Sequence, residues 1–389
     1  MSRAAPQPPP APGPQAPGAP PVLALCAAAG AIFLVAFALY AARFPYLPGF
    51  DDAEHVAAAL VWRDELRLGT SGLFVRVPLW QVLLGTLFQL ARPLLAIPAL
   101  QVSCVLATLA ACGVFVRHAS RTTPISTAAL VPPLLAFALA PQTLLYARHP
   151  VNELWIGALA AWVLALGVAR PRGAWLASGL AVGAAAMTKL SMGLLLLPAL
   201  IFAWRGDLLS RSRRLACVAL GAALVMGPCV ALHQLQRGQL PLDNTSAYTL
   251  GEYMPDAWIQ LGDHAERQRA GMQSFRRQLT EDPLGFAGAA IKRLGRWLSR
   301  PASADFALFV PGFPKRAVGL WEHAILWSLL ALAVAGTTRN TAPIWIFVLA
   351  LPVLCSLPVH VPFVPKILPI FPGLLLAPLG LARLLARGR

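Results

Sequence analysis

Charged side chains are scarce in this sequence. They make up 12% of the 389 residues, whereas hydrophobic side chains make up 57%. A typical soluble domain contains about 25% charged and about 45–50% apolar residues. This shortage of charge excludes an ordinary soluble protein, and the long apolar segments along the whole chain exclude a soluble body with a single anchor. We therefore expect an all-α, polytopic integral membrane protein.

Acidic residues are the rarer of the two charge types. The chain has 16 Asp and Glu against 32 Lys and Arg, a net charge of +16. In a soluble protein this excess would suggest nucleic acid. In a membrane protein it indicates basic cytoplasmic loops, so we expect membrane lipids as partners and no nucleic acid. The six cysteines lie in apolar segments without a CxxC pair or a His–Cys cluster, which argues against disulfides and a zinc site.

The apolar segments predict the topology. Residues 1–21 are rich in proline and are expected to form a disordered cytoplasmic tail. Ten candidate spanning helices follow, at 22–42, 96–116, 124–146, 153–169, 174–188, 190–204, 215–232, 317–335, 342–358 and 366–385.

The stretch 78–95 is also apolar, and the basic residues decide its place. If it lies along the surface, the inner side carries a charge of +12 and the outer side +4. This asymmetry favours about ten crossing helices, both termini in the cytoplasm, and interfacial helices in the first and fourth outer loops. The predicted units are a transmembrane module at 22–232 with its first outer loop at 43–95, a large outer loop at 233–316, and C-terminal helices at 317–389.

The most distinctive motif opens the first outer loop. It reads Phe50-Asp51-Asp52-Ala53-Glu54-His55, after Pro48 and Gly49, and an amphipathic helix is expected over 53–68. Acids at a helix start are favoured by the unpaired N–H groups, so capping alone could explain one of them. A cap needs a single acid, and the full set therefore indicates a catalytic or ligand-binding role. A divalent metal site at these four polar residues is left open.

The order of these segments resembles a known family. The acidic pair is followed by Arg76-Val77-Pro78-Leu79-Trp80, then by Tyr146-Ala147-Arg148-His149-Pro150-Val151-Asn152-Glu153 and by Ala186-Met187-Thr188-Lys189-Leu190. The pattern resembles the GT-C superfamily of polyprenyl-phosphate-dependent glycosyltransferases, particularly the protein mannosyltransferase and aminoarabinose transferase branch (glycosyltransferase family 39 and its relatives). This chain has Asp52 where the family carries Glu, and Pro78 alone of a proline pair.

The resemblance implies a reaction at the outer face of the membrane. The donor would be a sugar on a polyprenyl phosphate, with an unknown glycan, lipid or protein as acceptor and no required cofactor. Asp51 would be the general base, and Asp52 would orient the acceptor. Cations would hold the phosphate leaving group. The candidate substrate-binding residues are Glu54, His55, Arg148, His149, Glu153, Lys189, Arg293 and Lys366.

Each basic candidate also has a simpler explanation. Lys189 could be an interface anchor, Arg148 could pair locally with Glu153, and Lys366 could anchor the last helix. Arg293 belongs to a helix expected from Asp282-Pro283 onward, with an apolar face and a basic face, which could bind lipid headgroups alone.

Two other classes of function compete with the transferase. A transporter or flippase for a lipid-linked glycan predicts charges deep inside the bundle and an internal repeat, and the sequence indicates neither. A membrane scaffold would leave the outer acids dispensable. The composition favours a bacterial inner membrane, with the active site on the periplasmic side.

Overall fold

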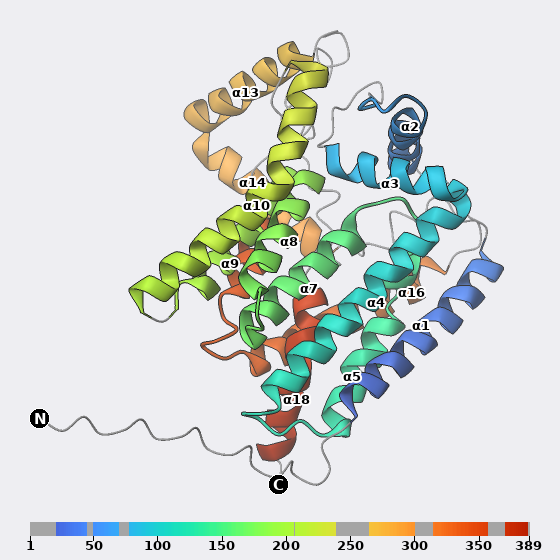
Figure 1. Ribbon diagram of the computed structural model, residues 1–389, viewed down its shortest axis with the longest axis vertical. Coiled ribbons are helices and arrows are strands. Elements are labelled where there is room, and N and C mark those ends of the chain that lie inside the picture. Colours follow the sequence, from blue (N-terminus) through green and yellow to red (C-terminus); the bar gives the residue numbers. More distant parts are fainter. Residues whose placement is uncertain are drawn as a thin grey trace, which may run out of the picture.

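The computed structural model describes residues 21–44, 50–69, 78–205, 207–238, 264–299, 314–356 and 370–387. Within these ranges the side chains of some helical residues, Asp51 and Asp52 among them, fall outside the description. Every regular element in the described ranges is a helix (Figure 1): α1 (Val22–Arg43), α2 (Phe50–Glu65), α3 (Pro78–Leu90), α4 (Pro93–Ala119), α5 (Thr127–Ala138), α6 (Pro141–Tyr146), α7 (Glu153–Ala169), α8 (Ala174–Thr188), the 3₁₀ helix η1 (Leu190–Leu195), α9 (Leu196–Ala203), α10 (Leu208–Arg237), α13 (His264–Glu281), α14 (Pro283–Ser299), α16 (Lys315–Gly336), α17 (Ile344–Ser356) and α18 (Ile370–Arg387).

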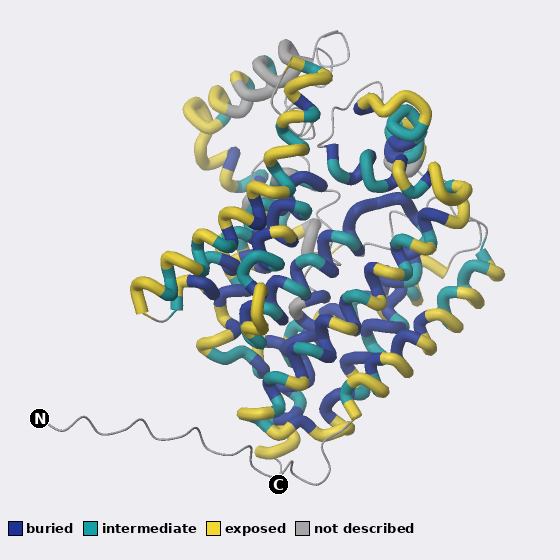
Figure 2. The backbone as a smooth tube through the Cα atoms, viewed as in Figure 1, coloured by how far each residue is buried: buried dark blue, intermediate teal, exposed yellow. Residues whose placement is uncertain are grey.

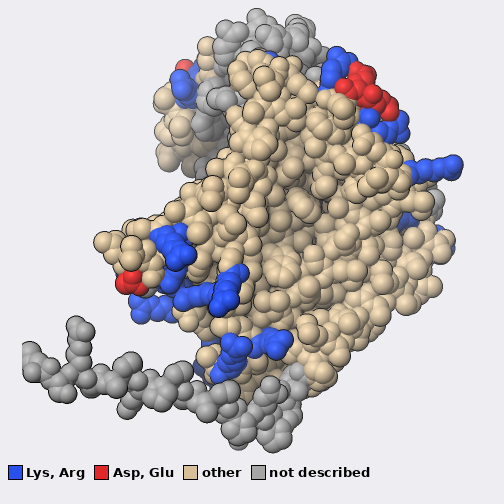
Figure 3. Space-filling view, in the orientation of Figure 1, with Lys and Arg blue, Asp and Glu red and all other residues tan. Residues whose placement is uncertain are grey.

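Four of these helices are long and apolar enough to cross a membrane: α1, α4, α10 and α16. Shorter apolar helices accompany them, including α5, α7 and α8. On the face shown in Figure 3, charged side chains gather toward the two ends of the molecule, and a broad uncharged band separates them. The chain is therefore an integral membrane protein. The expected count of ten crossings stays a prediction.

Prolines set several helix boundaries. Pro78, Pro93 and Pro141 each occupy the first residue of a helix, where the missing N–H costs no hydrogen bond. The predicted span 124–146 is divided into α5 and α6, because Ala140 before Pro141 takes an extended conformation with ψ 126°. The predicted surface helix 78–95 ends at Leu90, and its last three residues belong to α4.

The helix bundle has two ends. Figure 1 shows α2, α3 and α13 at the upper end, with α3 turned across the direction of α4. We call this the α2–α3 end. The lower end is formed where α4, α7, α9 and α18 finish and where α1 and α10 begin. Figure 2 shows that α7 is buried at the centre, whereas α1 and α10 expose one side along their length.

Glycines allow two pairs of helices to approach closely. Gly179 and Gly183 of α8 lie against the α10 backbone, and a Cβ on Gly183 would stand 2.7 Å from the carbonyl oxygen of Ala222. Gly221 of α10 lies against α8 in the same way, at the Leu176 carbonyl. Gly336 and Gly380 form the equivalent contact between α16 and α18. Small residues at such crossings let van der Waals packing hold helices together in lipid.

We predict that Gly221→Ala will destabilise the bundle. The new methyl group would overlap the Leu176 carbonyl oxygen, and overpacking of this kind costs about 1–3 kcal/mol. Gly227→Ala is the matched control, since nothing lies within 4 Å of its Cβ position in the same helix. Thermal unfolding in detergent should show a lowered Tm for the first variant and an unchanged or raised Tm for the second. Equal melting temperatures would contradict the close α8–α10 contact.

The predicted orientation can be tested by cysteine labelling in a cysteine-free background. Thr122 is exposed in the turn after α4, and Glu65 is exposed at the end of α2. The charge asymmetry predicts that an impermeant maleimide will label Glu65→Cys from outside the cell and Thr122→Cys only after permeabilisation. Labelling of Thr122→Cys in intact cells would show that the predicted topology is inverted.

Candidate functional site at the α2–α3 end

The acidic motif lies at the start of α2. Asp51 and Asp52 occupy the first turn of this helix, as the sequence predicted. The next two polar residues turn toward the protein, since Glu54 is 8% exposed and His55 is 5% exposed. The burial of both side chains is unusual for such polar residues. The motif therefore has one part at the helix start and another part packed inside.

The helix α2 rests on α3. Ala59 of α2 packs with Trp80 and Leu84 of α3 in one apolar cluster. Gly85 of α3 lets the two helices approach, because a Cβ there would stand 2.9 Å from the Cβ of Trp62 and closer still to the Ala59 carbonyl oxygen. These contacts fix the middle of α2 against α3.

Trp80 and Gln101 hold the loop 147–152. The indole of Trp80 is 2% exposed and donates a hydrogen bond from Nε1 to the Pro150 carbonyl oxygen at 2.7 Å. Gln101 of α4 donates from Nε2 to the carbonyl oxygens of His149 and Val151, at 2.7 and 2.6 Å. The ring of His55 meets Trp80 edge-on, with centroids 6.5 Å apart. Trp80 thus joins the first-loop motif to the loop 147–152.

The candidates Arg148, His149 and Glu153 have different surroundings. The guanidinium of Arg148 donates to the Phe44 carbonyl oxygen and lies 5.7 Å from the centre of the Tyr40 ring. Arg148 therefore connects the loop 147–152 to the end of α1. His149 is buried, and Glu153 is buried in the first turn of α7. A carboxylate in this position is favoured by the helix dipole.

The remaining candidates lie farther along the chain. Lys189 is half-buried and directly follows the last residue of α8. The helix α8 packs against α3. Arg293 is half-buried in α14, the helix expected after Pro283, and that helix buries Phe286 and Ala290 but exposes Ile291. Lys366 lies outside the described residues.

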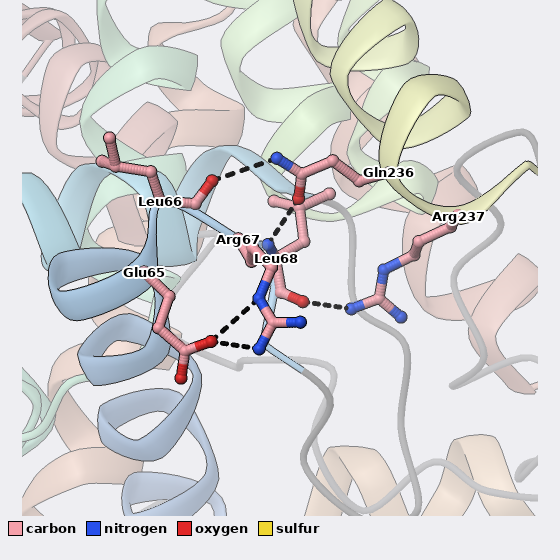
Figure 4. Close-up of polar contacts among 6 residues, drawn as sticks. All are labelled: Glu65, Leu66, Arg67, Leu68, Gln236 and Arg237. Atoms are coloured by element: carbon pink, nitrogen blue, oxygen red, sulfur yellow. Dashed lines mark hydrogen bonds and ion pairs between the residues drawn. The ribbon is translucent and has the colours of Figure 1, made fainter.

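Two side chains at the end of α10 hold the end of α2 (Figure 4). Gln236 donates to the Leu66 carbonyl oxygen at 3.0 Å and accepts from the Leu68 N–H at 2.7 Å. Nη2 of Arg237 donates to the carbonyl oxygens of Leu68 and Gly69, both at 2.8 Å. These four hydrogen bonds oppose fraying of the segment that follows α2. We call these two residues the α10 clamp.

The acids at the exposed end of α2 are engaged locally. The guanidinium of Arg63 hydrogen-bonds the adjacent carboxylate at 2.6 and 2.9 Å, which lowers the pKa of the Asp64 carboxyl below its ordinary value. Glu65 pairs with Arg67 in the same way. These exposed pairs add little stability. They also leave Asp64 poorly suited to accept a proton near neutral pH.

No metal site is formed among the residues that the structure describes, since no three His, Cys, Asp or Glu side chains converge there. The side chains of Asp51 and Asp52 lie outside that set. The metal hypothesis for the first-loop motif therefore stays a prediction.

Sequence reasoning missed Trp80, Gln101, Gln236 and Arg237 as site residues. Trp80 belongs to the motif Arg76–Trp80, whose pattern gives it no role. Gln101 is a polar residue inside an apolar helix, where it must find a partner, and that signal could have identified it. The α10 clamp gave no signal, because its partners are backbone atoms about 170 residues earlier.

Comparison with known proteins gives one distant structural match. The crystal structure of ArnT from Cupriavidus metallidurans bound to undecaprenyl phosphate is 18% identical, covering 93% of this chain and 77% of that chain, with a TM-score of 0.41. This similarity is too low to assign a shared function. No protein-family model and no curated protein sequence matches the chain.

We predict that Gln236→Leu will loosen α2. The substitution removes two hydrogen bonds, each worth about 0.5–1.5 kcal/mol net. Gln234→Leu is the control, because the side chain of Gln234 is exposed and makes no hydrogen bond with any residue that the structure describes. Limited proteolysis should cut the Gln236→Leu variant faster between α2 and α3. Equal cutting of both variants would show that the clamp does not restrain α2.

Proposed function

We propose that the protein is a membrane glycosyltransferase that moves a sugar from a polyprenyl-phosphate donor to an acceptor at the α2–α3 end. The observation that carries the proposal is the acidic pair Asp51-Asp52 in the first turn of a helix packed on the end of an apolar bundle. At this boundary an acceptor from water can meet a donor whose chain stays in lipid.

The chemistry requires a base and a means of holding phosphate. As the acceptor oxygen or nitrogen attacks the anomeric carbon, Asp51 takes its proton, while Asp52 orients the acceptor. The bond from the anomeric carbon to the phosphate oxygen breaks, and the electron pair leaves with the polyprenyl phosphate. Cations near that oxygen stabilise the growing negative charge.

Arg237 joins Lys189 as a candidate for the phosphate contact. Arg237 is half-buried at the end of α10, and its two backbone bonds use Nη2 alone among the guanidinium nitrogens. It makes no ion pair with an acid among the described residues. A guanidinium with free N–H groups is well matched to a phosphate. The place of Arg237 beside Gly69 keeps it close to the segment that joins α2 to α3.

One observation favours the transporter alternative. The sequence interpretation recognised no acid deep within a span, and the structure corrects this, since Glu322 is 0% exposed inside α16. A buried carboxylate in a membrane helix is costly and often marks an ion or substrate pathway. A transfer assay on detergent-solubilised protein separates the two functions, because a transferase forms a glycosylated product there and a transporter does not.

We predict that Asp51→Asn will abolish transfer without unfolding the protein. Asp51 is the second residue of α2, where Asn loses only the interaction of the charge with the helix dipole, about 0.3–1 kcal/mol. Asn cannot accept the proton, and general-base catalysis contributes about 10²–10⁴-fold. The measurements are transfer from synthetic undecaprenyl-phosphate hexoses and pentoses, and Tm on the same preparation. Asp52→Asn should reduce the rate less.

Asp64→Asn is the matched control for this experiment. It removes an acid from the same helix, but one that is exposed and paired with Arg63. Its transfer rate should stay close to that of the unmodified protein. A stable and fully active Asp51→Asn variant would contradict the mechanism, and a small stability loss without a rate loss would leave stabilisation of the helix start as the only role of Asp51.

A further inference from the structure

Five arginines meet at the end of the bundle opposite to α2 and α3. They come from separate segments: Arg170 follows α7, Arg205 follows α9, Arg214 belongs to α10, Arg339 lies between α16 and α17, and Arg383 belongs to α18. We call this set the arginine cluster. Figure 3 shows Lys and Arg side chains gathered toward this end on the face in view.

Contacts with the turn after α16 draw the cluster together. Arg205 donates to Asn340 Oδ1 at 3.0 Å and to the carbonyl oxygens of Arg339 and Asn340, both at 3.1 Å. Arg383 donates to the carbonyl oxygens of Ala335 and Thr337, at 2.8 and 2.9 Å. Arg214 donates to the Arg205 carbonyl oxygen. These bonds bring three helix ends to one turn.

The positive charges in the cluster are not matched by acids. Among the described residues, none of the five arginines forms an ion pair with a carboxylate. Asp207 caps α10 through Ser210, at 3.0 Å to the N–H and 2.7 Å to Oγ, and these bonds together with the charge of Arg214 lower the pKa of its carboxyl. One carboxylate does not balance five guanidinium groups. Burial lowers the pKa of Arg205, and the charges of Arg170 and Arg339 lower it further. The arginines are thus close enough to repel one another.

The backbone at Arg170 gives an independent sign of function. Arg170 ends α7 with φ 50° and ψ 45°, a left-handed conformation that glycine adopts at far lower cost. Strained residues of this kind persist mainly at functional positions. A helix end alone would favour glycine here, so the backbone geometry does not account for the arginine side chain.

The surroundings of the cluster fit a lipid headgroup. The guanidiniums of Arg211 and Arg214 lie over the rings of Trp204 and Trp175, at 5.6 and 5.7 Å from the ring centres. Leu208 and Leu209 are 75% and 82% exposed at the start of α10. Tryptophan, arginine and exposed leucine together are typical of the boundary between headgroups and acyl chains. Arginine binds phosphate with several directed hydrogen bonds.

We propose that the arginine cluster binds the phosphate group of an anionic phospholipid at the membrane surface opposite to the candidate active site. The lipid supplies the negative charge that the described residues lack, and it joins the ends of α7, α9, α16 and α18. Basic sites between helix ends on the cytoplasmic side recognise such headgroups through the same chemistry. This site is separate from the proposed transferase reaction and does not depend on it.

The test uses the full chain in detergent, with phosphatidylglycerol and phosphatidylcholine as probes and native mass spectrometry to measure bound lipid. The double variant Arg170→Gln, Arg339→Gln should bind phosphatidylglycerol at least about tenfold more weakly, since it loses charge-assisted hydrogen bonds. All four arginines are exposed, but the charges of Arg170 and Arg339 act on Arg205, whereas those of Arg172 and Arg213 do not. The control variant Arg172→Gln with Arg213→Gln therefore removes the same charge from this end outside the cluster. It should change the affinity by less than about threefold, because salt screens charges that do not contact the headgroup.

Arg170→Gly separates lipid binding from a structural role. Glycine suits the left-handed conformation, so the variant should melt at or above the temperature of the unmodified protein without added lipid. It should nevertheless bind phosphatidylglycerol more weakly. Equal losses in the two double variants would overturn the proposal in favour of general surface charge. Equal binding of phosphatidylcholine, competition by inorganic phosphate at the same concentration, or a lowered Tm of Arg170→Gly with unchanged lipid binding would also overturn it.

Discussion

Hydrocarbon contains no water, and this constraint governs where polar chemistry can stand in the protein. Charged and hydrogen-bonding side chains must reach an end of the bundle or find partners inside it. The apolar band is correspondingly held together by close helix contacts, such as Gly179 and Gly221 between α8 and α10. The two ends are left to carry the charge. The acidic motif stands at one of them and the arginine cluster at the other.

Side chains that bind distant backbone atoms then determine the shape of the α2–α3 end. Trp80 and Gln101 fix the loop before α7, and Gln236 fixes the residues after α2. All three side chains donate hydrogen bonds to carbonyl oxygens that accept none within a helix. Without these donors, the carbonyl oxygens would need water as a partner. One set of bonds therefore satisfies the backbone and also positions the end of α2 and the loop 147–152. A loosened bond would affect both stability and the place of the acidic pair.

The sequence predicts the helices better than their contacts. Apolar periodicity and proline positions predicted α1, α4, α7 and α14, because these signals are local. The start of α2 at the acidic motif was also predicted correctly. The helix α13 was missed, since its polar sequence carries no apolar period of the membrane kind. The α10 clamp and the burial of Glu322 depend on contacts between distant segments, which no local pattern encodes.

Each end of the bundle contains one residue with a strained backbone conformation. Among the described residues, Leu66 and Arg170 are the two with a positive φ that are not glycine, at 51° and 50°. Each conformation costs of order 1–3 kcal/mol and persists where surrounding contacts impose it. Gln236 donates a hydrogen bond to the Leu66 carbonyl oxygen at the end of α2. The hydrogen bonds of the clamp therefore offset part of the cost of the Leu66 conformation. Arg170 has no comparable clamp, because its side chain makes one long bond, at 3.4 Å, to the Gly167 carbonyl oxygen. Its strain is best balanced by an interaction of the guanidinium itself, and an anion at the arginine cluster would supply that interaction.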